Sequence, residues 1–263
     1  PDLFSIHDFA NVAPHSILLV NNAGKSLSID HDCEFHQDAR GGMGAAFGDT
    51  NRDGGLDIAQ TLLDDVSFLP SAPFSSSLSG WIWAFEQSEA LGITIDRSLG
   101  QQFGWGIEFG DLDNDGDLDL HGIFGDWAEM GPNEGPAVDA LWEQQENGAF
   151  IDKGPEWGLD DPNNGRGMVM TDLNRDGWLD VVKRELQNAE GIAHMARCGS
   201  EHWIGLRLSQ PGTRNHFAIG ATIDVWVGDD RQRRWIHAGS SSQFSGAPPE
   251  AHFGLGDQRT PDR

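Results

Sequence analysis

The stretch Asp111-Leu-Asp113-Asn-Asp115-Gly116-Asp117-Leu-Asp119 decides how this chain of 263 residues is interpreted. Carboxylates stand at positions 1, 3, 5 and 9 of the loop, and the glycine at position 6 permits a sharp turn. A backbone carbonyl at position 7 would complete the set. Ca²⁺ takes about six to eight oxygen ligands, and this spacing wraps such ligands around one point. The stretch predicts a calcium loop, and its many aspartates predict the tightest site of the chain.

Two further loops repeat the pattern: Asp49-Thr-Asn51-Arg-Asp53-Gly54-Gly55-Leu-Asp57 and Asp172-Leu-Asn174-Arg-Asp176-Gly177-Trp178-Leu-Asp180. The loops start at residues 49, 111 and 172, so they are 62 and 61 residues apart, which indicates an internal repeat. Position 7 is expected to act through its carbonyl. The predicted ligands are Asp49, Asn51, Asp53, Gly55 and Asp57, then Asp111, Asp113, Asp115, Asp117 and Asp119, then Asp172, Asn174, Asp176, Trp178 and Asp180.

Other ions and other loop families fit less well. Zinc would require Cys or His at these positions, and magnesium usually keeps several waters. An EF-hand needs a bidentate glutamate at position 12, where this chain has Gln60, Gly122 and Lys183. The alternative is three solvated acidic turns without metal. Carboxylates crowded into one turn repel each other, however, and a bound cation relieves that repulsion.

Each repeat predicts a strand, a metal loop and a second strand. A Gly-rich alternating stretch such as 104–109 leads into the loop, and a short apolar run such as 118–120 follows it. Residues 16–29 and 141–151 are typical of hairpins, and residues 81–95 occupy the matching place in the middle unit. A unit of about 60 residues and four short strands suits a β-propeller blade. The predicted fold is all-β, a propeller-like array of blades followed by a β-rich C-terminal segment.

The charge balance excludes several classes of partner. Lys plus Arg number 17 against 42 for Asp plus Glu, a formal net charge of −25, which argues against binding the nucleic-acid backbone or an anionic membrane surface. No apolar run approaches the roughly 18 to 20 residues of a membrane span. The basic cluster Arg231-Gln-Arg-Arg234 is predicted to be a solvated turn between two strands; contact with an acidic partner is the alternative.

Cysteine, histidine and tryptophan leave further alternatives open. Cys33 and Cys198 lie before the first loop and after the third, and they either form one long-range bridge or stay two buried thiols. His31 and His36 flank Cys33, but no second His/Cys cluster supports a transition-metal site. Capping of blade cores is predicted for four tryptophans, with a carbohydrate-binding platform as the alternative: Trp81, Trp83, Trp105 and Trp127. No catalytic residue is assigned from the sequence.

Two sets of motifs resemble known families. Phe47-Gly48-Asp49 and Phe109-Gly110-Asp111 resemble FG-GAP/VCBS repeats, and Met170-Thr171-Asp172 departs from that pattern while keeping the ligands. Gly212-Thr-Arg214-Asn215 and His252-Phe-Gly-Leu-Gly256, together with Ala218-Ile-Gly-Ala221 between them, look like an ASPIC/UnbV domain. The combination resembles the cartilage-acidic-protein-like family, with blades at 1–198 and the ASPIC/UnbV-like segment at 199–263.

The resemblance implies a calcium-bound propeller in an extracellular or periplasmic location. We expect an interaction or assembly module with a protein partner. The alternatives are a propeller enzyme of natural-product biosynthesis that forms carbon–carbon bonds or cyclises its substrate, and a structural subunit of a larger complex. An enzyme should show a deep pocket with convergent acids or histidines of shifted pKa, whereas a binding module should show a shallow face.

Ring closure is a separate expectation. Three calcium units and the C-terminal segment provide about four blade equivalents, and propellers have roughly four to eight blades. We expect an open arc whose strand edges are covered by another chain or by further sequence, since exposed edges promote aggregation. The alternative is a compact four-bladed ring. The chain begins at Pro1 without Met, which is consistent with a removed initiator or signal peptide; a truncated chain is the alternative.

Overall fold

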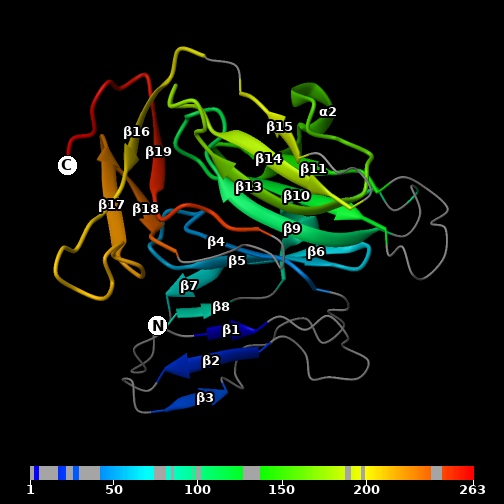
Figure 1. Ribbon diagram of the computed structural model, residues 1–263, viewed down its shortest axis with the longest axis horizontal. Helices are drawn as coiled ribbons and strands as arrows, with labels where there is room; N and C mark the ends of the chain where they lie inside the picture. Colours follow the sequence, from blue (N-terminus) through cyan, green and yellow to red (C-terminus); the bar gives the residue numbers. More distant parts are fainter. Residues whose placement is uncertain are drawn as a thin grey trace.

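The computed structural model describes residues 3–5, 17–21, 26–29, 42–73, 81–83, 86–96, 98, 102–126, 137–186, 191–196, 199–237 and 245–263. Within these ranges the chain is all-β, as predicted, and its strands form several small antiparallel sheets. Figure 1 shows the sheets of the repeats lying side by side, with the strands of residues 202–256 set against one end of them. No helix in the described ranges has the length and apolarity needed to span a membrane.

The N-terminal part and the first repeat form three sheets. The first sheet is β1 (Leu3–Ser5), β2 (Ile17–Asn21) and β3 (Leu27–Ile29). The second sheet is β4 (Ala45–Gly48), β5 (Asp57–Leu62) and β6 (Asp65–Leu69). The third is the pair β7 (Ser71–Pro73) and β8 (Trp81–Trp83), and the single helical turn α1 (Ser88–Leu91) follows it.

The second and third repeats form one meander each. The second contains β9 (Phe103–Gly110), β10 (Asp119–Gly125), β11 (Ala140–Gln144) and β12 (Phe150–Asp152), and the turn α2 (Gly154–Trp157) follows it. The third contains β13 (Gly165–Thr171), β14 (Asp180–Glu185) and β15 (Gly191–His194). The C-terminal segment forms two ladders, in which β16 (His202–Leu206) pairs with β19 (Ala251–Gly256) and β17 (Thr222–Val227) pairs with β18 (Asp230–Trp235).

Two of the predicted hairpins are confirmed. β2 pairs with β3 and β11 pairs with β12, and Gly148 in the second turn has a φ of 80°. The segment 81–95 differs, because β8 pairs with β7 and the chain then enters α1. The carboxylate of Glu86 accepts the backbone N–H groups of Ser88 and Phe68, and Gly92 ends the helical turn in the left-handed conformation.

The three aspartate loops occupy equivalent places in three sheets. In each case the residue before loop position 1 pairs with the aspartate at position 9: Gly48 with Asp57, Gly110 with Asp119, and Thr171 with Asp180. Each loop therefore closes an antiparallel pair at the same register. The sequence repeat therefore corresponds to a repeat of structure. The strand ladders among the described residues run within the individual sheets, so closure into a ring stays a prediction.

Buried apolar residues hold neighbouring sheets together. One cluster, which includes Phe68, Leu120 and Trp142, joins the first and second repeats, and another, which includes Ile123 and Val181, joins the second and third. The Gly-rich lead-in stretches permit this packing. A Cβ on Gly44 would lie 3.0 Å from the carbonyl oxygen of Trp105, so the backbones of neighbouring repeats touch there.

A buried ionic cluster lies where the second repeat meets the third. The Lys183 ammonium is 2.5 Å from Asp139, 3.2 Å from Asp161 and 3.5 Å from Glu185, and only 1% of its side chain is exposed. Burial opposes the charge of Lys183, but Asp139 and Asp161 outweigh burial and raise the pKa of the ammonium. Lys183 is therefore the cation on which this buried group of carboxylates depends.

Replacing Lys183 by methionine should lower the free energy of unfolding by about 3–5 kcal/mol, because the buried carboxylates lose their cation. Urea denaturation at pH 7 measures the change. Lys153→Met is the matched control, since Lys153 pairs with Glu156 at the surface and its loss should be far smaller. Equal losses for the two variants would contradict a structural role of the buried cluster.

Candidate metal loops and an adjoining pocket

The three loops share one hydrogen-bond pattern. The carboxylate at position 1 accepts the N–H of the glycine at position 6, at 3.0 Å for both Asp49 and Asp111 and 2.9 Å for Asp172. The side chain at position 3 accepts the N–H of position 5, and the carboxylate at position 5 accepts the N–H of position 7. These bonds turn the side-chain oxygens of each loop toward its interior.

The backbone of each loop needs two left-handed residues. Position 4 has a positive φ in every loop, 57° at Arg52 and 63° at both Asn114 and Arg175. The glycine at position 6 follows, with φ values of 92°, 98° and 91° in the three loops. Glycine adopts this conformation readily, which is the physical reason for its place in the motif.

The aspartate at position 9 fastens each loop to its sheet. Asp119 is buried, and its two carboxylate oxygens accept the N–H groups of Leu112 and Gln144, both at 3.0 Å. Asp57 accepts from Thr50 and Ser71 in the same way, and Asp180 accepts from Leu173 and Ala196. The loop pattern predicts that these aspartates are closing ligands; in the structure they also link each loop to a later segment of its repeat.

The middle loop brings three carboxylates together. Oxygens of Asp111, Asp113 and Asp115 all lie within 4.8 Å of one another, the one group of three such residues found among the described residues. Oδ1 of Asp111 is buried and has no hydrogen-bond partner among the described residues. In the other two loops an asparagine stands at position 3, so Asn51 and Asn174 would contribute amide oxygens. A buried acceptor beside two carboxylates suits a hard cation such as calcium.

Burial and mutual repulsion make these carboxylates costly to ionise. Burial, together with the charges of Asp115 and Asp113, raises the pKa of Asp111 to about 7. Burial and the charge of Asp113 raise the pKa of Asp115 to about 7, and burial raises that of Asp49 to about 6. The shift at Asp111 occurs despite the opposing charge of Arg234. A divalent cation in the middle loop would remove this cost.

The loops also contact each other. Arg52 of the first loop forms an ion pair with Asp117 of the second at 2.7 Å, and Asn114 of the second donates to the carbonyl of Gly177 in the third at 3.0 Å. The side chain of Asp117 is therefore engaged outside its own loop. The three loops form one continuous surface at one end of the sheets.

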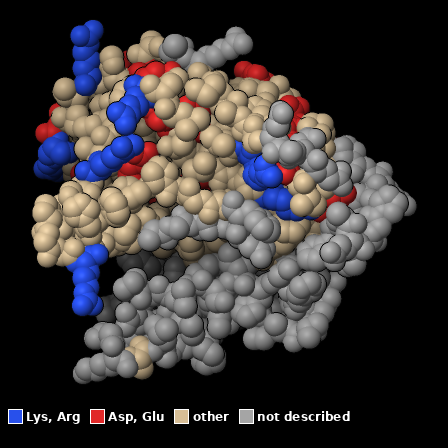
Figure 2. All heavy atoms as spheres, in the orientation of Figure 1, with Lys and Arg blue, Asp and Glu red and all other residues tan. Residues whose placement is uncertain are grey.

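The C-terminal segment docks on this surface. The prediction of a solvated turn at residues 231–234 is therefore wrong. These residues belong to strand β18, where Arg231 and Arg233 donate to the carbonyls of Arg52 and Gly54 at 3.4 and 2.9 Å. Arg234 is half-buried, and burial lowers the pKa of its guanidinium although the charges of Asp111 and Asp49 oppose that shift. The acidic partner of the basic cluster is thus the chain's own loop surface. Figure 2 shows basic side chains lying among acidic ones on one face of the molecule.

Strand β19 touches the middle loop directly. Gly254 donates its N–H to Oδ2 of Asp111 at 2.8 Å, and Gly256 donates to the carbonyl of Asn114 at 2.9 Å. A Cβ on Gly254 would overlap both the Asp111 carboxylate and the Asn114 backbone. Only glycine lets the strand come this close. Nε2 of His252 lies 2.7 Å from Oδ1 of Asn114, so this strand holds the αL residue of the loop as well.

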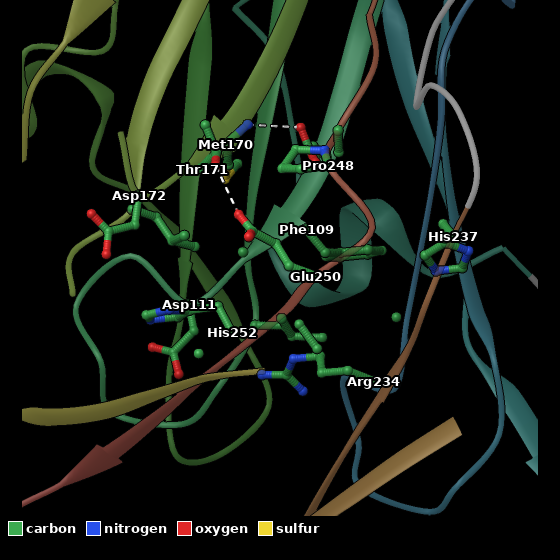
Figure 3. Close-up of a pocket in the computed structure, with 18 of the residues that line it drawn as sticks. Phe109, Asp111, Met170, Thr171, Asp172, Arg234, His237, Pro248, Glu250 and His252 are labelled. Carbon is green, nitrogen blue, oxygen red and sulfur yellow. Dashed lines mark hydrogen bonds between the residues drawn. The ribbon is translucent and has the colours of Figure 1, made fainter. Parts of the chain in front are cut away.

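A cavity of about 490 Å³ lies where the C-terminal segment meets the repeats. Its walls come from β4, β9, β13, the middle and third loops, and the C-terminal segment. Figure 3 shows Asp111, Arg234 and His252 near one another, with Thr171 hydrogen-bonded to Glu250 above them. The polar residues that line it are Glu108, Asp111, Thr171, Asp172, Arg175, Arg207, Arg234, His237, Glu250 and His252.

Two groups in this pocket have strongly shifted pKa values. Burial raises the pKa of Glu108 to about 8, although the N–H of Met170 opposes the shift. Burial lowers the pKa of His252 to about 4, and the nearby charge of Arg234 lowers it further. Sequence analysis did not single out either residue as functional. A lone carboxylate within the buried, Gly-rich lead-in strand was the available signal for Glu108.

The other candidate residues are placed as follows. Trp105 is buried with Met43 and Phe103, and the guanidinium of Arg166 lies 4.0 Å from the centre of its ring. It is therefore a core residue, as predicted for a blade cap. The cysteines and the histidines beside Cys33 lie outside the described residues, as do the side chains of the other three tryptophans.

Comparison with known families finds one match. A family model described as ASPIC and UnbV matches residues 212–263, which contain β17, β18 and β19. The C-terminal segment thus contains an ASPIC/UnbV domain, as the sequence motifs suggest. No curated protein matches the chain significantly. The strands that dock on the aspartate loops belong to the matched part of the chain.

Replacing Asp119 by alanine should lower the free energy of unfolding by about 3 kcal/mol, because two buried N–H groups lose their acceptor. The loss should appear in EDTA as well as in calcium, since it does not depend on a metal. Urea denaturation under both conditions measures it. Asp117→Ala is the control, because its carboxylate contacts a half-exposed arginine, and its loss should be smaller. A loss at Asp119 confined to calcium would mean that metal ligation is its sole role.

Proposed function

We propose that this protein is a calcium-binding β-repeat module whose aspartate loops hold the C-terminal domain in place. The observation that carries the proposal is the middle loop, where three carboxylates converge and Oδ1 of Asp111 is buried with no hydrogen-bond partner in the described ranges. The donor set consists of oxygens alone, which calcium prefers. Asp111, Asp113 and Asp115 would hold the ion, with the carbonyl of Asp117, and Asp119 would orient the loop.

The same carboxylate links metal binding to the C-terminal domain. Oδ2 of Asp111 accepts the N–H of Gly254, while Oδ1 is buried and has no hydrogen-bond partner among the described residues. A cation on Oδ1 would keep Asp111 ionised, and an ionised carboxylate is the stronger acceptor for Gly254. We therefore infer an interaction or assembly role, in which calcium fixes one arrangement of repeats and domain for a protein partner. We also propose an extracellular or periplasmic location, which the resemblance of the loops to FG-GAP/VCBS repeats implies.

A catalytic role is the second candidate. The cavity beside the loops is partly open to solvent and contains two groups with shifted pKa, Glu108 and His252, which is an arrangement expected of an enzyme more than of a flat binding face. A carboxyl group with a pKa near 8 can donate a proton at neutral pH. This observation favours a small-molecule site, either catalytic or purely for binding.

Replacing Asp115 by alanine should weaken calcium binding far more than replacing Asp117. Position 5 would bind through its side chain, whereas position 7 would bind through its carbonyl and uses its carboxylate to pair with Arg52. Calorimetric titration of both variants with calcium measures the difference. Similar losses of affinity would show that the assigned ligand positions are wrong.

Calcium should raise the melting temperature by several degrees relative to EDTA. A site filled at 100 times Kd contributes about 2.7 kcal/mol. The raised pKa values of Asp111 and Asp115 mean that the metal-free native state binds more protons than the unfolded chain between about pH 4 and 7. Its stability therefore falls as pH rises through that window, and the effect of calcium should be larger at pH 8 than at pH 5. Equal melting curves with and without EDTA would refute the proposal.

A further inference from the structure

The walls of the cavity at the junction combine apolar side chains with polar and charged ones. Aromatic and aliphatic side chains from both the repeats and the C-terminal segment surround it, and its volume of about 490 Å³ lies within the range of small-molecule sites. The apolar side chains are Phe47, Phe109, Leu118, Met170, Leu179, Trp203, Trp235 and Pro248. The identity of a ligand depends on which polar groups remain without partners inside these walls.

Most of the polar groups in the cavity are already engaged. Glu250 accepts from Thr171 at 3.0 Å and from Arg207 at 2.5 Å, so both of its oxygens have donors. His252 contacts Asn114 and stacks on Trp203 with ring centres 6.1 Å apart. Asp172 accepts N–H groups from its own loop. These side chains build the walls of the cavity and leave little capacity for a ligand.

Among the arginines that line the cavity, which include Arg175 and Arg207, Arg234 has a buried guanidinium nitrogen without an acceptor among the described residues. Its Nη1 donates to the carbonyl of Arg233 at 3.1 Å, and its guanidinium lies 5.3 Å from the ring centre of Phe253. Nη2 is buried and has no hydrogen-bond partner within the described part of the chain. Asp111 and Asp49 act on Arg234 through their charges, without an ion pair. A buried guanidinium N–H without an acceptor is costly, and an anionic ligand would satisfy it.

Glu108 supplies a second donor. Among the described residues its side chain accepts one hydrogen bond, from the N–H of Met170 at 3.0 Å to Oε2. Burial raises the pKa of Glu108 to about 8, which favours the protonated carboxyl group, and a protonated carboxyl can donate to a ligand oxygen. The groups available in the cavity are thus a cationic donor and a neutral donor, and both select acceptor oxygens.

We propose that the junction cavity binds a small amphipathic organic anion, with a carboxylate or similar acid group on Arg234 and an apolar, aromatic body against the surrounding walls. The site draws on both the repeats and the ASPIC/UnbV domain, so it exists only when the two are docked. The inference rests on the proposed function in one respect, since calcium in the middle loop would neutralise Asp111 beside Arg234.

The test uses two fluorescent probes at saturating calcium. One is 8-anilinonaphthalene-1-sulfonate, an aromatic anion, and the other is the uncharged N-phenyl-1-naphthylamine. Arg234→Met keeps an unbranched stem over Phe253 but removes the charge. It should weaken the anionic probe by about tenfold or more and change the uncharged probe by less than about twofold. Arg259→Met, at an exposed arginine outside the cavity, should bind both probes as the unchanged protein does.

A second variant fills the cavity without touching its charges. Ala247 is half-buried in the lining, and Ala247→Trp should abolish the binding of both probes. Wild-type affinity for the anionic probe in Arg234→Met, or for both probes in Ala247→Trp, would overturn the proposal. Calorimetric calcium titration of the same samples separates the two hypotheses. A protein that binds calcium but neither probe refutes the cavity site alone, whereas absent calcium binding refutes the proposed function.

Discussion

The carboxylate of Asp111 is the interaction on which most of the architecture converges. One of its oxygens accepts N–H groups from its own loop and from strand β19, and the other is buried without a hydrogen-bond partner among the described residues. The carboxylates of Asp113 and Asp115 lie close by. The burial of Asp111 beside like charges is unfavourable in the absence of a counter-charge. Arg234 of the C-terminal domain supplies a positive charge on one side of Asp111, and the proposed divalent cation would supply one on the other. Loop geometry, domain docking and the adjoining cavity therefore share one electrostatic centre.

Local patterns in the sequence predicted much of the fold. The glycine and asparagine turns predicted two hairpins, and the constant spacing of Asp49, Asp111 and Asp172 predicted equivalent loops, which the identical pairing registers confirm. These features depend on residues close together in the chain. The same reasoning led to the ASPIC/UnbV domain, because its motifs are short and contiguous. The calcium ligation itself stays a prediction.

What could not be predicted depends on distant contacts. The cluster at 231–234 has the composition of an exposed turn, and only the fold shows that its arginines meet backbone carbonyls of the first loop. The aspartates at position 9 have the right chemistry for a metal ligand. In the structure they also accept hydrogen bonds that hold each loop to a later segment, which the spacing of the loop residues does not predict. The sequence does not mark Glu108 and Arg234 as candidate site residues, because strands from two distant regions of the chain line the same cavity only in the folded structure.

The docking of the last strands on the first loops has a consequence for the order of folding. The contact between Arg233 and Gly54 spans 179 residues, and that between Gly254 and Asp111 spans 143. Each loop, by contrast, closes between adjacent strands. Contacts of long sequence separation form slowly, because a long segment of chain must be closed before they are made. During synthesis the repeats can therefore assemble while their acidic end is still uncovered, and the C-terminal strands can dock on them only after residues 230–256 have emerged.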